Sequence, residues 1–508
     1  MIDLAGGFVA LFSDGYAFLF VILGAAIGVL IGALPGLTTA AVIAMIVPVT
    51  SYMSPLSALA LLYVIGKAGR YGGSIAAILF NTPGTTAAAA TGIDGHPLAK
   101  QGKAGKALKM ATLGSVVGDL TGEMILIFGA ATIAIYTIRL GPPEYFAIYM
   151  MAFVVIGSVV SSSMLKGLAS SALGVLLAMV GLDFISGVDR YVFGSVNLMG
   201  GFSLVPLLVG TFVMSEVMVQ LEATRRGEMA TSIVAPPTSP DDNNLNREDL
   251  RYSLPVMGRS AIIGSVIGLL PGLGSAVACF IAYGEERRRA KRPELWGKGA
   301  IEGVAAPETA NNAVSGPSMI PVLALGIPGS TIAAIMIGVF LIQGVQVGPT
   351  IFTTSKDLVY GLFAAGITGI VCYGIIGWFF APRIGRLIGR VPQRQIYPVI
   401  LMLTVIAVYS VGNSLFDVVV MFLFGLLGYV MRKLDFSLPA LVISFVLARG
   451  AEEALQQTFM MSADGMAFFL DRPAALIFFA IGIATLLIRL YARFRQLSRG
   501  RALPDTHP

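Results

Sequence analysis

The amino-acid sequence predicts an all-α polytopic membrane protein with about ten to twelve membrane segments, including broken or re-entrant helices. The first observation is composition. The chain has 508 residues, of which 56% are hydrophobic and 12% charged, and its mean hydropathy is +0.83. Soluble domains carry about 25% charged residues. The second observation is an internal duplication of short motifs that contain Pro-Gly.

Long apolar runs recur along the chain, and crossing a bilayer takes roughly 20 apolar residues. They lie at residues 16–34, 150–165, 207–219, 367–380, 416–430 and 474–487. No polar stretch is long enough for a large soluble domain. The first basic residue is Lys67, whereas a cleavable signal peptide needs a basic n-region. We therefore expect the first helix to be retained, with its amino terminus outside.

The small number of cysteines and histidines excludes several kinds of site. Cys279 and Cys372 lie in or beside apolar segments, which indicates neither a disulfide framework nor a metal cluster. His96 and His507 are the only histidines, so a multi-histidine transition-metal site is excluded. No histidine pair or Ser-His-Asp set indicates an enzyme. We expect no catalytic residues and no cofactor, with Na⁺ the one metal ion that remains open.

Two motifs occur twice. Residues 31–40 return as residues 267–276, both with Leu-Pro-Gly-Leu, and residues 82–89 return as residues 327–334, both with Pro-Gly before a hydroxyl pair. A polar, proline-containing stretch separates the two copies. We predict a first half at residues 1–221, a cytoplasmic linker at 222–255 and a second half at 256–508.

The charges of the loops predict that these halves are inverted relative to each other. Loop 285–298 carries six Lys or Arg residues, whereas the matching loop 50–57 carries none. After the second motif the pattern reverses: residues 100–109 carry four lysines and residues 339–355 none. Basic loops face the cytoplasm, so matching loops lie on opposite sides of the membrane. The alternative is chance variation in loop charge.

The Pro-Gly breaks predict a cavity in the membrane. Proline lacks an amide hydrogen and glycine adds backbone freedom, so each break frees backbone groups. Such groups persist only inside protein or beside water. Freed carbonyls suit Na⁺ and helix amino termini suit carboxylates; the alternative is tight turns at the membrane surface. The predicted ion-binding residues are Gly36, Thr38, Gly272, Ser275 and Glu308.

Polar residues around the second motif predict a substrate site. Lys67 and Arg70 are cations near membrane depth, where a charged residue is functional by default, and they would attract an anion. The alternative is that both side chains snorkel to the interface. The alternative for each Ser and Thr is a bond between helices. The predicted substrate-binding residues are Lys67, Arg70, Ser74, Asn81, Thr82, Pro83, Gly84, Thr85, Asn311, Asn312, Pro328, Gly329, Ser330 and Thr331. Asp119, Glu123 and Glu144 are further candidates in or near the membrane.

Six motifs follow one another along the chain: Gly32-x-Leu34-Pro35-Gly36-Leu37, Tyr71-Gly72-Gly73-Ser74-Ile75, Asn81-x-Pro83-Gly84-Thr85, Asp94-Gly95-x-Pro97, Pro307-Glu308-x-Ala310-Asn311-Asn312-Ala313 and Gly326-x-Pro328-Gly329-Ser330. With these motifs the chain resembles, over about residues 10–490, the large membrane subunit of the tripartite tricarboxylate transporters. Phe80 and His96 depart from the pattern of that family.

The resemblance implies a bacterial inner-membrane carrier that takes up citrate or another carboxylate on an ion gradient, with Na⁺ as the expected coupling ion. It also implies two partners, a small membrane subunit (TctB-like) and a periplasmic solute-binding protein (TctC-like). The absence of a Gly-x-x-x-x-Gly-Lys-Ser/Thr phosphate loop agrees with transport without ATP. A carrier of another small solute, or an anion channel, remains the alternative.

Overall fold

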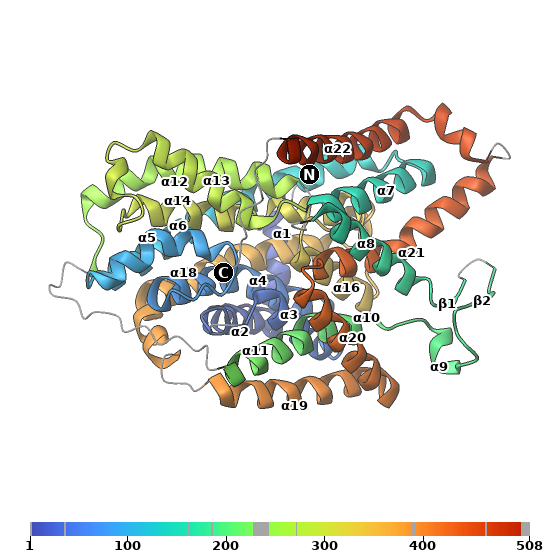
Figure 1. The fold of residues 1–508 in the computed structure, drawn as a ribbon, viewed down its shortest axis with the longest axis horizontal. Coiled ribbons are helices and arrows are strands. Elements are labelled where there is room, and N and C mark those ends of the chain that lie inside the picture. Colours follow the sequence, from blue (N-terminus) through green and yellow to red (C-terminus); the bar gives the residue numbers. More distant parts are fainter. Residues whose placement is uncertain are drawn as a thin grey trace. The chain divides into compact units, whose positions relative to one another are not determined.

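The computed structural model describes residues 3–34, 37–159, 163–183, 186–226, 243–270, 272–388, 393–462 and 465–498. Over these residues the regular secondary structure is helical apart from one hairpin, in which β1 (Gly181–Leu182) pairs antiparallel with β2 (Asp189–Arg190) (Figure 1). The prediction of an all-α polytopic membrane protein is confirmed. Of the predicted linker 222–255, residues 227–242 lie outside the described part.

The chain forms two compact units, and each unit takes segments from both predicted halves. The first unit combines Met1–Ile138 with Ser203–Val430, and the second combines Arg139–Phe202 with Met431–Pro508. The helices of the second unit are α7 (Pro142–Val159), α8 (Met164–Ala178), α9 (Val196–Met199), α21 (Leu438–Met461), the 3₁₀ turn η5 (Gly465–Asp471) and α22 (Pro473–Ser498). All four Pro-Gly motifs lie in the first unit.

The first unit opens with six helices before the chain enters the second unit. They are α1 (Leu4–Ser13), α2 (Gly15–Gly32), α3 (Thr39–Thr50), α4 (Pro55–Phe80), α5 (Ala88–Lys100) and α6 (Ala104–Thr137). It resumes with α10 (Leu204–Leu208), the π-helix η1 (Val209–Met214), α11 (Ser215–Arg226), α12 (Arg247–Leu269), α13 (Gly274–Arg289), η3 (Pro293–Leu295), α14 (Glu302–Ala313), η4 (Pro317–Met319), α15 (Ile320–Leu325), α16 (Thr331–Ile342), α17 (Ile351–Thr354), α18 (Lys356–Ile388), α19 (Gln393–Gly412) and α20 (Leu415–Lys433).

Among the described residues, seven helical segments are long and apolar enough to cross a membrane. They are Gly15–Gly32, Ala104–Thr137, Leu204–Ala223, Arg247–Leu269, Lys356–Ile388, Leu415–Lys433 and Pro473–Tyr491. Shorter apolar helices accompany them, and two of these, α3 and α16, begin directly after a Pro-Gly break. The total of about ten to twelve segments therefore stays a prediction, because it depends on how the short helices are counted.

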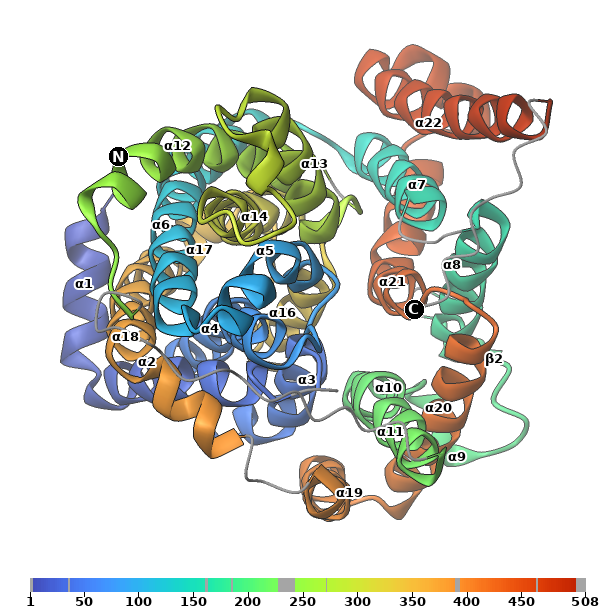
Figure 2. The same ribbon diagram turned by 60° about the vertical axis from the view of Figure 1, so that its left-hand side comes forward.

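The duplication is visible in how the helices of the first unit pack. α6 packs against α12 and α14 of the other half, and α18 packs in the same way against α2 and α4 (Figure 2). The helices that follow the second break cross over too: α5 contacts α13 and α14, and α16 contacts α3 and α4. Each half therefore completes the packing of the other.

Contacts between loops agree with the inverted arrangement. The two basic loops meet where Gln101 Nε2 donates to Lys298 O at 2.8 Å. The two uncharged loops also meet, through a bond of 2.6 Å from Gln343 Nε2 to Thr50 O. These are pairs of non-equivalent loops, which inversion requires.

Helix ends follow from local sequence. Ser54 caps α4, accepting from the Ser57 amide, and proline occupies the first position. α4 ends at Asn81, which has a positive φ of 54°. Asparagine tolerates this left-handed conformation better than most residues. The capping therefore fixes where the second break begins.

Glycines bring α6 and α14 close together. A Cβ at Gly118 would overlap the Thr309 carbonyl, and one at Gly122 would lie 2.7 Å from the Ala313 carbonyl oxygen. Small residues at this spacing let helix backbones approach closely. Inside a bilayer the hydrophobic effect does not drive helices together, so this close packing stabilises their association. This contact sets the distance between the polar faces of the two helices.

We expect Gly118→Ala to destabilise the protein by about 1–3 kcal/mol, because the new methyl group overpacks the contact. Gly284→Ala on α13 is the matched control, since a Cβ there meets nothing within 4 Å. Its helix should be unchanged or slightly more stable. The measurement is thermal unfolding in detergent; equal melting temperatures for the two variants would contradict the close packing.

Candidate functional site

A buried ion cluster joins α4, α6 and α18. Lys67 Nζ lies 2.6 Å from Asp119 Oδ1 and 2.7 Å from Glu123 Oε2, and all three side chains have an exposed fraction of 0%. Tyr63 Oη donates to Glu123 Oε2 at 2.8 Å, and Tyr373 Oη donates to Asp119 Oδ2 at 3.2 Å. Lys67 therefore does not snorkel to the surface.

The charge of Lys67 is already compensated within the protein. One ammonium faces two carboxylates, so the cluster has a formal surplus of one negative charge. A buried ion is costly unless it is paired and hydrogen-bonded. Both carboxylates hold Lys67 from the same helix, one turn apart, which fixes its head group. This arrangement leaves Lys67 with less attraction for an incoming anion than the sequence suggested.

Arg70 lies three residues further along α4 and has no such partner. Its Nη1 donates to Asn311 O at 3.2 Å, and its Nε has no partner among the described residues. Arg70 forms no ion pair with any described carboxylate, although it is only 8% exposed. The side chain of Asn311 is 1% exposed, and neither its oxygen nor its nitrogen has a partner among the residues that the structure describes. A guanidinium and a carboxamide with unused donors thus lie together.

A second polar cluster surrounds Glu308 on α14. Its carboxylate accepts hydrogen bonds from Ser74, from Thr91 at 2.5 Å and from Ser115 at 2.8 Å, so four helices contribute. Asn312 Nδ2 donates to Ser115 Oγ and to Glu308 O, both at 3.0 Å. All are buried. Carboxylate, hydroxyl and amide oxygens are the ligands that hard cations prefer.

Local contacts stabilise the break after α4. Thr85 Oγ1 accepts from the Ala88 amide at 3.2 Å and thus supports the start of α5, while Thr82 Oγ1 has no partner. Gly84 is packed tightly: a Cβ would lie 2.7 Å from Gly32 O. Pro83 is exposed. Of the residues predicted here, Thr82 alone has a buried polar atom that nothing in the described chain satisfies.

The equivalent break before α16 is joined to the other break of its half. Gly272 N donates to Gly329 O at 3.1 Å. Ser330 caps α16, accepting from Ala333 N at 3.2 Å, and Thr331 is the first residue of that helix. Pro328 is buried beside them. The two breaks of the second half therefore form one connected backbone element.

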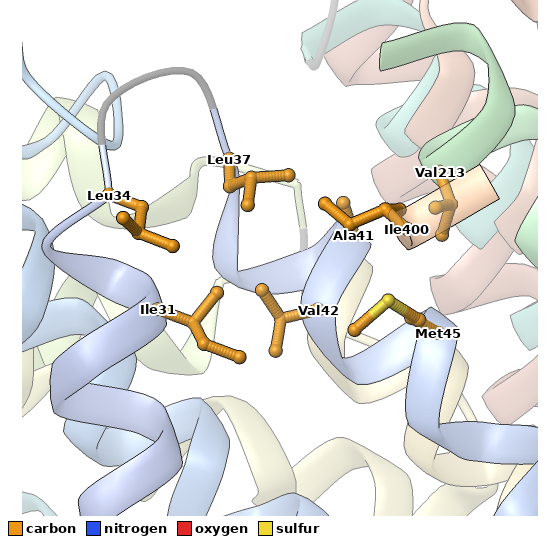
Figure 3. A pocket seen from close by; sticks show the side chains of 8 residues that line it. All are labelled: Ile31, Leu34, Leu37, Ala41, Val42, Met45, Val213 and Ile400. Atoms are coloured by element: carbon orange, nitrogen blue, oxygen red, sulfur yellow. The ribbon is translucent and has the colours of Figure 1, made fainter. Parts of the chain in front are cut away.

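Apolar side chains among the described residues surround the break between α2 and α3. It borders a small cavity of about 100 Å³ (Figure 3), and Thr38 caps α3 by accepting from Ala41 N at 3.2 Å. Ser275 lies at the start of α13. Gly36 lies outside the described residues, as do Pro35 and Pro271. The residues that line the cavity are Ile31, Leu34, Leu37, Ala41, Val42, Met45, Val213 and Ile400. Their side chains offer no oxygen ligand for Na⁺.

Sequence reasoning ranked two residues too low and missed others. Asp119 and Glu123 are central, whereas Glu144 belongs to the second unit and accepts from Gly141 N at 2.8 Å. Thr91, Ser115, Tyr63 and Tyr373 were not predicted. A usable signal existed, because Ser115, Asp119 and Glu123 follow one another at intervals of four and therefore share a helix face.

Comparison with known proteins gives one family and two relatives. The model described as "Tripartite tricarboxylate transporter TctA family" matches residues 18–443. An uncharacterized 52.8 kDa protein in the TAR-I ttuC' 3' region of Agrobacterium vitis is 35% identical over 475 residues, 93% of each chain. An uncharacterized protein in the TAR-II ttuC' 3' region of that organism is 35% identical over 235 residues, 46% of this chain and 96% of its own. No solved structure matches the chain.

We expect Lys67→Met to destabilise the protein by about 3–5 kcal/mol, because two buried carboxylates lose their cation. The triple variant with Asp119→Asn and Glu123→Gln should recover most of the loss, since no charge remains within the Lys67 cluster. Lys356→Met, which breaks an exposed pair with Asp3, is the control and should change little. Melting temperatures in detergent are the measurement. No difference between the single and triple variants would refute the cluster.

Proposed function

This chain belongs to the tripartite tricarboxylate transporter TctA family, and we propose that it performs secondary active uptake of a di- or tricarboxylate resembling citrate. Membership makes it a component of a tripartite tricarboxylate transporter and a multi-helix membrane protein. The substrate, the coupling ion and the bacterial inner membrane as location belong to the proposal. The observation that carries it is the buried Arg70 beside Asn311.

The substrate argument rests on what Arg70 and Asn311 leave unused. A guanidinium offers donors in a planar fork that matches a carboxylate, often through two parallel bonds. Asn311 adds an amide donor beside it, and its unsatisfied atoms would be costly if they had no function. Lys67 is neutralised by Asp119 and Glu123, so Arg70 is the cation that we assign to the substrate. A second carboxylate group would lie near the break residues, where Thr82 has a free hydroxyl.

The coupling argument rests on the cluster around Glu308. Four buried oxygen-bearing side chains from α4, α5, α6 and α14 converge there, with one negative charge. A monovalent cation would neutralise that charge, and its loss would leave a buried carboxylate. We propose Na⁺ at this position. Because Ser74 and Arg70 lie one turn apart on α4, ion and substrate would be bound by the same helix, which allows the two to be coupled.

We further propose that delivery follows the tripartite pattern, with a periplasmic solute-binding protein (TctC-like) and a small membrane subunit (TctB-like) as partners. The amino terminus would then be periplasmic and the linker cytoplasmic. The Pro-Gly breaks supply the backbone freedom that alternating access needs. The connected breaks at Gly272 and Gly329 would move together.

Arg70→Gln should weaken carboxylate binding at least tenfold, since a charge-assisted bond contributes about 1.5–3 kcal/mol. Binding is read as the rise in melting temperature of purified protein with citrate, malate or succinate. Arg287→Gln, which removes an exposed cation, is the control and should bind normally. If no carboxylate stabilises the wild-type protein, or if Arg70→Gln responds equally, this assignment fails.

Glu308→Gln should abolish the dependence of uptake on a Na⁺ gradient, because the carboxylate no longer favours a cation. The measurement is labelled carboxylate uptake into proteoliposomes that contain the chain and its two partners, with the exposed Glu294→Gln as control. Uptake that responds to a proton gradient and ignores Na⁺ would refute Na⁺ coupling. Uptake that is equally fast with no gradient would indicate a channel.

A further inference from the structure

A basic cavity lies where α12 and α13 meet the loop that joins α13 to α14. It has a volume of about 310 Å³, and five basic side chains line it against two acidic ones, a formal surplus of three positive charges. Pockets of this volume hold small molecules or head groups. The cavity lies wholly within the first unit and shares no residue with the Arg70 or Glu308 clusters.

Three of its cations are held by protein groups, Arg259 by an ion pair with Glu286 and the other two by the ring of Tyr252. Glu286, only 1% exposed, accepts from Arg259 Nε at 2.8 Å and from Arg259 Nη2 at 2.5 Å. The Tyr252 ring lies 5.7 Å from Lys291 Nζ and 5.3 Å from Arg292 Cζ. A cation over an aromatic ring keeps its full charge.

Two cations of the cavity have no carboxylate partner at all. Neither Arg251 nor Lys291 forms an ion pair with any described residue, whereas Arg289 pairs with Glu285 at 2.7 Å. A phosphate would therefore find two free cations, with the positioned Arg259 beside them. The chemistry of the lining points to a phosphodiester or phosphate anion.

An apolar stripe leads away from the cavity along α12. Leu254, Ile262 and Val266 are 54%, 64% and 54% exposed, and Gly258 lies between them at the same spacing of four. A Cβ at Gly258 would meet nothing within 4 Å, so the stripe is grooved there. Residues four apart share one helix face. The helix that lines the cavity thus also carries an exposed apolar stripe, and this helix is a candidate membrane span.

The cavity is also lined by aromatic side chains of the kind that gather at membrane interfaces. Tyr252 and Trp296 both line the cavity, and these two residue types gather where head groups meet the acyl chains. Basic pockets at the cytoplasmic ends of membrane helices bind anionic head groups. A soluble anion would need the cations but not the apolar stripe.

We infer that this cavity is a binding site for an anionic phospholipid, with the phosphodiester head group held by Arg251, Arg259 and Lys291 and an acyl chain lying along the α12 stripe at Gly258. Such a lipid would stabilise the packing of α12 against loop 285–298. Because α12 packs on α14, which carries Glu308 and Asn311, bound lipid would also steady the helix that carries the proposed substrate and ion residues.

The test is native mass spectrometry of the delipidated full chain titrated with phosphatidylglycerol or phosphatidylcholine. Phosphatidylglycerol should bind at least tenfold more tightly. The Arg251→Gln, Lys291→Gln double variant should lose about tenfold of that affinity, since each cation contributes to anionic lipid binding. The matched control is Arg287→Gln, Arg288→Gln, which removes the same charge from exposed positions outside the cavity and should bind like the wild type.

A second readout uses the two tryptophans of the chain. In a Trp378→Phe background, phosphatidylglycerol with brominated acyl chains should quench Trp296, and Gly258→Leu should reduce the quenching by filling the groove. Inorganic phosphate that displaces the lipid at equal concentration would overturn the lipid assignment. Equal affinity for both lipids, or equal loss in the two double variants, would overturn it as well.

Discussion

The buried ion cluster is the constraint on which the first unit depends. Lys67 on α4 is fully enclosed, so its charge requires carboxylates at two positions of α6. Glycines on the same helix admit α14 at close range. Tyr373 brings α18 into the same cluster. Packing and electrostatics therefore specify one arrangement of α4, α6, α14 and α18 together.

This arrangement separates two kinds of polar group along α4. The charge of Lys67 is compensated by Asp119 and Glu123, so this residue has a structural role. Arg70, one turn later, has a hydrogen-bond donor without a partner among the described residues and lies beside Asn311. Ser74, a further turn along, reaches Glu308. Under the proposed function, one helix face would carry a structural anchor, a group that binds the anion and a ligand for the cation in sequence. Substrate and coupling ion would then act on the same rigid helix, which is a physical route to coupled transport.

The Pro-Gly motifs have more varied roles than their repetition suggested. The breaks of the second half are tied to each other by a bond between Gly272 and Gly329, and Ser330 and Thr38 are helix caps. The described residues beside the break after α2 line an apolar cavity. Repeated sequence therefore preserved the broken backbone, while the surrounding helices decided whether polar ligands face it.

The sequence by itself determined the all-α membrane class, the family and the cations that are candidates for the site. It could do so because hydropathy, Pro-Gly duplication and intramembrane charge are local properties. It placed Lys67, Arg70, Ser74, Glu308 and Asn312 among the candidates. Only the tertiary structure showed that Asp119 and Glu123 neutralise Lys67, and that Thr91 and Ser115 reach Glu308. Which charge is paired and which is left unpaired depends on contacts between helices far apart in the chain, and no local pattern encodes those distances.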